Sequence, residues 1–140
     1  MLTETAVLCL SMVMYAEARG EPTEAMQAVG DTVIYRLSHN EEYQDVCQVV
    51  LKRKQFSWTR KLNDRSVFGL MDYQEKILRG IKPKDLIAYQ KAEKMAVKML
   101  SDDYRPKYHY SHFYDGKAPS WAKGKPSRKI GALHFMKGVK

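Results

Sequence analysis

The amino-terminal part of the chain is strongly apolar and predicts a buried helix. Residues 6–16 contain no charged side chain, so a helix over about Thr3 to Ala18 would be apolar nearly all round. This pattern is typical of a helix that packs against neighbours on most of its sides. The apolar run has only 11 residues, too few to cross a bilayer. We therefore expect a central first helix and no stable membrane insertion.

A second helix is expected after a break at Gly20 and Pro22, because proline suits the first helical position. Its apolar residues recur with a helical period, at Ala25, Val29, Val33 and Leu37. The polar residues between them are expected to face outward, and these are Glu24, Gln27 and Asp31.

Further helices and one irregular stretch are expected in the middle of the chain. The pattern predicts a short helix over 43–51, one over 73–78 that ends before Gly80, and a long one from 83 or 84 to 100. Residues 55–58 alternate polar and aromatic, which predicts a small strand or a binding loop. From Tyr104 onward, proline, glycine and aromatic residues recur, as in loops and short strands. The fold class is therefore α+β and predominantly helical, with one domain over residues 1–140.

Composition agrees with a globular domain and adds a marked charge asymmetry. Hydrophobic residues make up 44% of the 140 residues and charged residues 29%. Residues 1–50 hold 2 basic and 8 acidic residues, whereas the remainder holds 22 and 8, a net charge of +14. A basic surface of this size usually meets a polyanion, which can be nucleic acid, an anionic membrane surface or an anionic cell wall.

The two cysteines, Cys9 and Cys47, each lie among apolar residues. This setting favours two buried free thiols over a disulfide.

The segment Tyr15–Pro22 carries the clearest candidate chemistry. Glu17 lies at the end of the apolar run, and Gly20 and Pro22 force a turn directly after it. A carboxyl group at the edge of a core helix can have its pKa raised by desolvation, as general acid catalysis requires. The alternative is a solvated glutamate at an ordinary helix terminus.

Four blocks of sequence resemble the catalytic domain of the SleB-type cell-wall hydrolases, which include spore-cortex-lytic enzymes and small phage lysins. The blocks are Tyr15–Pro22; Ala28–Val29 with Val33–Arg36; Val46–Val50 with Gln55–Trp58; and His109–Phe113, Pro119–Trp121, Ile130–Gly131 and His134–Phe135. They follow the family's order and span about residues 13–136. Two positions depart from the pattern. Tyr35 replaces the usual asparagine, and His134 follows Gly131 by three residues instead of two, so no role is assigned to His134.

The resemblance implies a lysozyme-like fold with a small β element beside the cleft. It also implies cleavage of the β-1,4 bond between N-acetylmuramic acid and N-acetylglucosamine in peptidoglycan, with Glu17 as the catalytic glutamate. A hydrolase of this kind uses a second carboxylate, and Glu21 is the candidate near in sequence. Because Gly20 and Pro22 interrupt the helix between them, we favour a lytic transglycosylase with one catalytic carboxyl and a 1,6-anhydro product. A hydrolytic muramidase is the alternative.

The remaining candidate site residues are predicted to bind substrate. Glu21 is expected to contact the sugar or to orient the motif loop. Aromatic faces pack on pyranose rings and amides bind hydroxyl groups, so a sugar-binding wall is expected at Gln55, Phe56, Ser57 and Trp58. A second group of candidates is Tyr110, His112 and Trp121. Core packing is the alternative for the aromatic members.

Two other functions remain open from the sequence. His109, His112 and His134 could in principle bind zinc, as in peptidoglycan amidases, but neither cysteine joins them and no H-E-x-x-H helix is present. A basic nucleic-acid-binding protein would explain the charge, yet no nucleic-acid motif occurs. We expect no metal ion, no other cofactor and no nucleic-acid partner.

The start of the chain does not resemble a secretory signal, because Glu4 stands where a positive segment is required. We expect a monomer that is made in the cytoplasm and reaches the cell wall after phage-mediated release.

Overall fold

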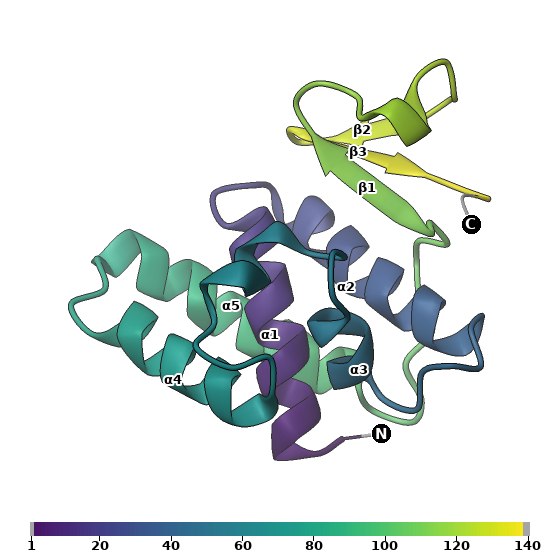
Figure 1. Cartoon of the computed structure of the whole chain (residues 1–140). Helices are drawn as coiled ribbons and strands as arrows, with labels where there is room; N and C mark the ends of the chain where they lie inside the picture. The colour runs from purple at the N-terminus through teal and green to yellow at the C-terminus, as the bar shows by residue number, and fades with distance from the viewer. Residues whose placement is uncertain (1, 139–140) are drawn as a thin grey trace.

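The computed structural model describes residues 2–138, and its centre is helix α1, Glu4–Ala18. Figure 1 shows α1 surrounded by the other helices, and most of its residues are buried. The helix begins where the Thr3 side chain accepts a hydrogen bond from the Ala6 backbone N–H, at 3.0 Å. It ends before Gly20, whose φ of +83° requires the left-handed conformation that glycine adopts freely. The predicted central helix is confirmed.

The other helices surround α1 in chain order. They are α2 (Thr23–Ser38), α3 (Val46–Leu51), α4 (Val67–Leu78) and α5 (Pro83–Met99), with short 3₁₀ helices η1 (Ser57–Lys61) and η2 (Ser120–Ala122).

Two of the helical predictions need correction, and so does the strand alternative for residues 55–58. Pro22 is the residue before α2 and not its first turn. Residues 55–58 form no strand, because Phe56 leads directly into η1. Helix α4 begins six residues earlier than predicted, where the Ser66 hydroxyl accepts a hydrogen bond from the Gly69 backbone N–H. This serine is a helix-start signal that the apolar pattern alone did not reveal.

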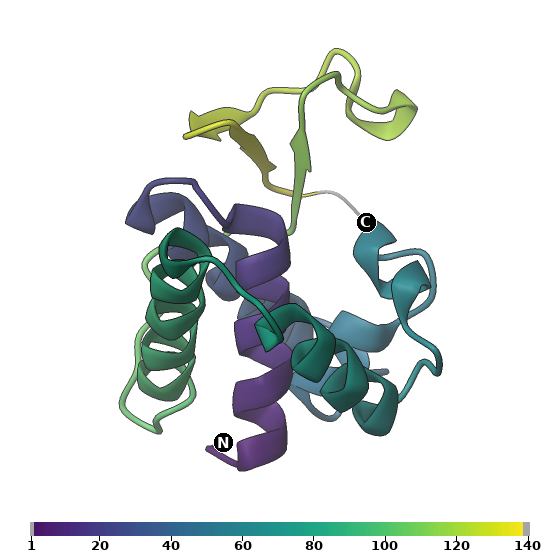
Figure 2. The same ribbon diagram turned by 90° about the vertical axis from the view of Figure 1, so that its left-hand side faces the viewer.

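The carboxyl-terminal segment forms a three-stranded antiparallel sheet in the order β1-β3-β2. Its strands are β1 (His112–Asp115), β2 (Arg128–Ile130) and β3 (Leu133–Met136). Figure 2 shows the sheet standing over the end of α1 that carries Glu17. The α+β, mainly helical fold is therefore confirmed, with the sheet placed where it can form one side of a site.

Asp31 was predicted to face outward, and the structure contradicts this because the residue is completely buried. Its carboxylate accepts hydrogen bonds from the Tyr104 hydroxyl at 2.6 Å and from the backbone N–H groups of Lys107 and Tyr108, both at 3.0 Å. The helical period placed Asp31 off the apolar stripe, but the segment that covers it comes from more than 70 residues later in the chain.

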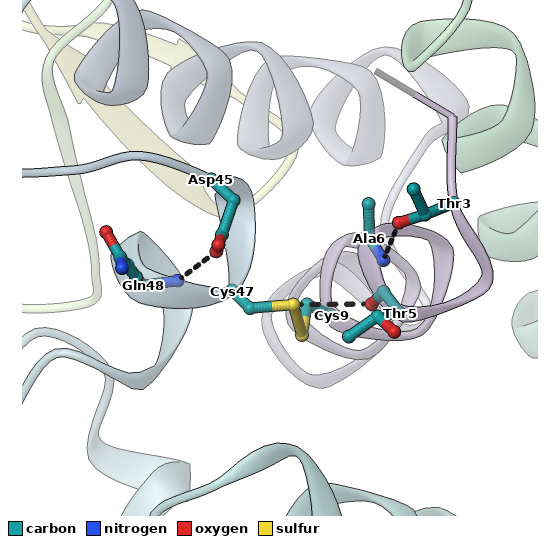
Figure 3. Close-up of a disulfide and its surroundings, with 7 residues drawn as sticks. All are labelled: Thr3, Thr5, Ala6, Cys9, Asp45, Cys47 and Gln48. Carbon is teal, nitrogen blue, oxygen red and sulfur yellow. Dashed lines mark hydrogen bonds between the residues drawn. A yellow bond between two sulfur atoms is a disulfide. The ribbon is translucent and has the colours of Figure 1, made fainter.

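The prediction of free thiols is also wrong, because Cys9 and Cys47 form a disulfide between α1 and α3. Figure 3 shows this bond beside the capping hydrogen bonds of Thr3 and Asp45. Burial suits a thiol and a disulfide equally well. The fold decides between them by bringing the two Cα atoms to 5.2 Å, within the range that a disulfide needs.

None of the helices within residues 2–138 has the length and apolarity needed to span a membrane.

We expect removal of the disulfide to lower the free energy of unfolding by about 3 to 4 kcal/mol, because the bond closes a loop of 38 residues in the unfolded chain. Denaturant unfolding with and without dithiothreitol measures this difference. The matched control is the double variant Cys9→Ala/Cys47→Ala, whose unfolding should not respond to the reductant. An oxidised protein with the same stability as its reduced form would contradict the prediction.

Candidate active site

A pocket of about 680 Å³ lies where the helical body meets the sheet. Its lining comes from separate parts of the chain: Glu17 of α1, Arg36 of α2, the segment 53–57 that leads into η1, and Tyr114 and Asp115 of β1. Figure 2 shows the sheet opposite the end of α1. The pocket thus contains the carboxyl group that the sequence singled out.

The electrostatic surroundings raise the pKa of Glu17 from 4.5 to about 7. The largest cause is desolvation by burial, and the negative charge of Asp115 acts in the same direction. The Trp58 indole and the positive charge of Arg36 act in the opposite direction. A carboxyl group with this pKa can hold its proton near neutral pH and still release it, which suits a group that must act as both acid and base.

Trp58 is positioned to stabilise the ionised form of Glu17. Its ring is buried and stacks on Tyr73 with a centroid distance of 5.9 Å. Within residues 2–138 the indole N–H has no regular hydrogen-bond acceptor, although it lies close enough to Glu17 to lower its pKa. Trp58 was predicted to bind sugar. The structure places its ring in the core, and its indole N–H lowers the pKa of the Glu17 carboxyl group.

Arg36 is a site residue that the sequence analysis did not single out. Its Nε–H donates to the Ser111 carbonyl at 2.8 Å, and an Nη1–H donates to the Gln55 side-chain oxygen at 3.3 Å. The guanidinium also lies over the Phe56 ring, 5.4 Å from its centroid. Arg36 therefore links the residue just before β1 to the 55–58 segment, and its positive charge acts on Glu17. The sequence did contain an indication of this role. Arg36 follows Val33 by three positions, so it lies on the same side of α2 as the buried apolar stripe.

Asp115 is the second carboxylate in the pocket, and no pattern in the sequence pointed to it. It lies 98 positions after Glu17 and reaches the pocket through the sheet. The candidate that is near in sequence, Glu21, goes elsewhere.

Glu21 does not line this pocket, and its side chain contacts the sheet. Its carboxylate accepts a hydrogen bond from the Ala132 backbone N–H at 2.8 Å, in the turn between β2 and β3. Gly131 in that turn has a φ of +61°, and a Cβ there would collide with the Glu21 carboxylate. The interaction ties the loop after α1 to the turn between β2 and β3. The predictions that Glu21 contacts the sugar or orients the motif loop stay predictions.

The other candidates divide between the pocket and its surroundings. Gln55, Phe56, Ser57 and Trp121 line the pocket, with Trp121 40% exposed and Phe56 buried beneath the wall. Tyr110 is buried and packs against Phe135 at a centroid distance of 5.4 Å. His112 lies in an adjoining pocket of about 660 Å³ that shares Arg36 and Gln55 with the first. Burial and the nearby charge of Arg36 lower the pKa of His112 to about 4.

In the described residues, no three histidine, cysteine, aspartate or glutamate side chains come together as a metal site would require. His134 stacks on Tyr114, with a centroid distance of 4.9 Å and nearly parallel rings. His109 is exposed.

The chain belongs to the Cell Wall Hydrolase family, whose family model matches residues 20–136. Two solved structures are similar, each with 16% sequence identity and a TM-score of 0.60. One is the catalytic domain of the Bacillus cereus SleB protein, with 98% of this chain and 93% of that chain covered. The other is the catalytic domain of the germination-specific lytic transglycosylase SleB from Bacillus anthracis, with 97% of each chain covered. No curated protein sequence matches the chain. Because Glu17 precedes the matched range, its role depends on the geometry of the pocket.

We expect Glu17→Gln to abolish activity while stabilising the fold above pH 7. The pKa of Glu17 is higher in the folded protein than its ordinary value, so its ionisation between about pH 4.5 and 7 destabilises the native state. The variant should therefore gain up to about 3 kcal/mol of unfolding free energy at pH 8 and almost nothing at pH 4. Denaturant unfolding at the two pH values, together with turbidity clearing of peptidoglycan, measures both effects. Residual activity above a few per cent would refute the catalytic assignment.

We expect Asp115→Asn to move the alkaline limb of the pH–activity profile to lower pH. Loss of the neighbouring negative charge lowers the pKa of Glu17, so this carboxyl group loses its proton at a lower pH. The movement should be a fraction of a pH unit, because Asp115 is exposed and screened by solvent. Lys117→Gln, an exposed charge change two positions away, is the matched control and should not move the limb in the same direction.

Proposed function

We propose that this protein is a lytic transglycosylase that cleaves the β-1,4 bond between N-acetylmuramic acid and N-acetylglucosamine in peptidoglycan. The observation that carries the proposal is Glu17 in its pocket, a carboxyl group with a pKa of about 7 beside a wall of aromatic and amide side chains. Membership of the Cell Wall Hydrolase family supports the substrate class. The similar fold of the lytic transglycosylase SleB from Bacillus anthracis supports the reaction type.

The chemistry needs one carboxyl group that acts first as a general acid and then as a general base. Glu17 donates its proton to the glycosidic oxygen while the bond from that oxygen to C1 of the muramic acid breaks. The 6-hydroxyl oxygen of the same sugar then bonds to C1, and its proton passes to the Glu17 carboxylate. The products are a 1,6-anhydro-muramic end and a free 4-hydroxyl on the glucosamine. No water is consumed, and Glu17 returns to its protonated form.

The neighbours of Glu17 suit these two roles. Desolvation and Asp115 favour the protonated acid that begins the reaction. The Trp58 indole N–H and the Arg36 charge favour the carboxylate that exists between the two proton transfers. The balance places the pKa near neutrality, where neither form is strongly disfavoured.

The wall of the pocket supplies groups that suit a sugar. Trp121 is a partly exposed aromatic face, and Gln55 and Ser57 are exposed polar groups on the same pocket. Aromatic rings bind the apolar face of a pyranose, and amide and hydroxyl groups bind its hydroxyls and acetamido group. The net charge of +14 in residues 51–140 suits an anionic cell wall.

The disulfide supports action at the wall and not in the cytoplasm. Disulfides persist in oxidising surroundings, whereas cytoplasmic reductants keep cysteines as thiols. The Cys9–Cys47 bond joins the helix that carries Glu17 to the helix that precedes the sugar-binding wall.

The product distinguishes this reaction from hydrolysis. We expect mass spectrometry of released muropeptides to show 1,6-anhydro-muramic ends, lighter by one water than hydrolysed ends. Asp115→Asn and Glu21→Gln should each keep a large part of the wild-type rate and give the same product, because neither carboxylate takes part in a bond change. Activity should also persist in EDTA.

Two outcomes would contradict the lytic route. Reducing ends together with an inactive Asp115→Asn variant would assign a hydrolytic pair to Glu17 and Asp115. Loss of activity on chelation with recovery on zinc addition would assign an amidase.

A further inference from the structure

The pocket contains positive charges that the proposed chemistry at Glu17 does not use. Besides Arg36, its lining includes Arg53, Lys54, Arg60 and Arg65, all from the segment between α3 and α4. We call these four residues the basic rim. They stand on the same pocket as the catalytic carboxyl, so their ligand must lie beside the bond that is cleaved.

The basic rim is not neutralised by the protein. Within residues 2–138, no carboxylate lies within 4.0 Å of any of its four cations, whereas Arg19, Lys52 and Arg79 each have an acidic partner. Arg53 and Lys54 are exposed and make no hydrogen bond to the described part of the chain. Four like charges on one pocket repel each other, so the arrangement is suited to an anion from outside.

Lys54 has a backbone conformation that does not favour lysine. The Gln55 backbone N–H donates to the Lys52 carbonyl at 3.2 Å, which closes a turn with Lys54 at its third position. The φ of Lys54 is +69°, the left-handed region in which glycine is favoured. Among residues 2–138 it is the only residue other than glycine with a positive φ. Such positions concentrate at binding sites, where the side chain has a use.

Arg65 has a different task from the other three. One of its Nη1–H groups donates to the Thr59 hydroxyl at 2.8 Å, and the same atom lies 3.3 Å from the Leu51 carbonyl oxygen. It therefore holds the 51–59 segment in place. Arg53 and Lys54 keep all their side-chain donors for a ligand, and Arg60, whose Nε–H donates to the Ser57 carbonyl at 3.4 Å, keeps its remaining donors.

We propose that the basic rim binds the carboxylates of the peptide attached to the muramic acid whose bond is broken. This inference rests on the proposed function, because it takes that sugar to lie with its C1 at Glu17. Muramic acid carries its peptide through an ether on C3 of the same ring, so the peptide begins only a few bonds from the scissile bond. Its free carboxylates then lie within reach of cations on the same pocket, and arginine is well suited to bind them.

The consequence is a preference for glycan strands that carry carboxylate-bearing peptides. Exposed charge pairs typically contribute about twofold each in binding, so the three cations together should give a preference of about fivefold to tenfold in kcat/KM. The preference should shrink as salt is raised, because the rim is open to solvent.

The test compares two soluble, uncross-linked substrates that differ only in charge. One is peptide-bearing glycan strands, and the other is the same strands after conversion of their peptide carboxylates to carboxamides. Release of anhydro ends gives kcat/KM for each, and the quantity of interest is the ratio between the two substrates. The wild-type protein should prefer the carboxylate form.

Three variants sharpen the test. Arg53→Gln/Arg60→Gln should bring the ratio close to one, mainly by lowering kcat/KM on the carboxylate form. Lys54→Gly should lower the ratio while leaving the thermal midpoint unchanged or higher, because glycine suits the φ of this position. The matched control is Lys94→Gln/Lys98→Gln, which removes two exposed charges from α5 and should keep the wild-type ratio.

The outcomes separate this inference from the proposed function. Equal cleavage of both substrates by the wild-type protein, with anhydro products, would overturn the basic rim as a peptide site and leave the transglycosylase standing. A rim variant that lowers both rates equally would also overturn it. If kcat/KM falls when phosphate-bearing wall polymers are removed and does not change when the peptide carboxylates are amidated, the cations bind phosphate. Failure to cleave either substrate would refute the proposed function itself.

Discussion

The site depends on one buried carboxylate, that of Asp31 in α2. A buried carboxylate strongly destabilises the folded protein unless its oxygens accept hydrogen bonds. Here three donors from residues 104–108 supply these hydrogen bonds. Desolvation is still the largest influence on the Asp31 pKa and raises it. The interaction fixes the chain just before β1, and β1 delivers Tyr114 and Asp115 to the pocket. The anchor adds to the apolar packing of Ile130, Leu133 and Phe135 in the same hydrophobic core.

A second carboxylate completes the attachment of the sheet. Glu21 accepts a hydrogen bond from Ala132 at the far turn, so the sheet is held at its entry by α2 and at its β2–β3 turn by the loop after α1. Glu17 and Glu21 are four positions apart, yet one lines the pocket and the other holds the wall opposite it. Gly20, with its φ of +83°, ends the helix between them and allows the two side chains to take different partners.

The pocket combines two electrostatic regimes that serve different purposes. Around Glu17, burial outweighs the attraction of Arg36, so the acid keeps its proton up to about neutral pH. Two of the Arg36 N–H groups donate to the Ser111 carbonyl and the Gln55 side-chain oxygen, and the guanidinium acts on Glu17 through its charge. Toward solvent, no carboxylate of residues 2–138 lies within 4.0 Å of the cations of the basic rim, and their charge is available for a ligand. The proposed chemistry thus lies at the buried end of the pocket, and the proposed peptide recognition lies at its exposed end.

The sequence by itself determined the features that depend on neighbours along the chain. A charge-free run must be buried, so α1 and the position of Glu17 at its end were predictable, as were the stripe of α2 and the proline start of α5. Tertiary structure decided everything that depends on partners distant in the chain. Asp31 is buried because residues 104–108 cover it, and Cys9 pairs with Cys47 because α3 packs on α1. Asp115 joins Glu17 only because the sheet folds over the helix end. Helical periodicity reports which face of one element is apolar, but the pKa of a carboxyl group and the pairing of a thiol are set by atoms that other elements bring to it.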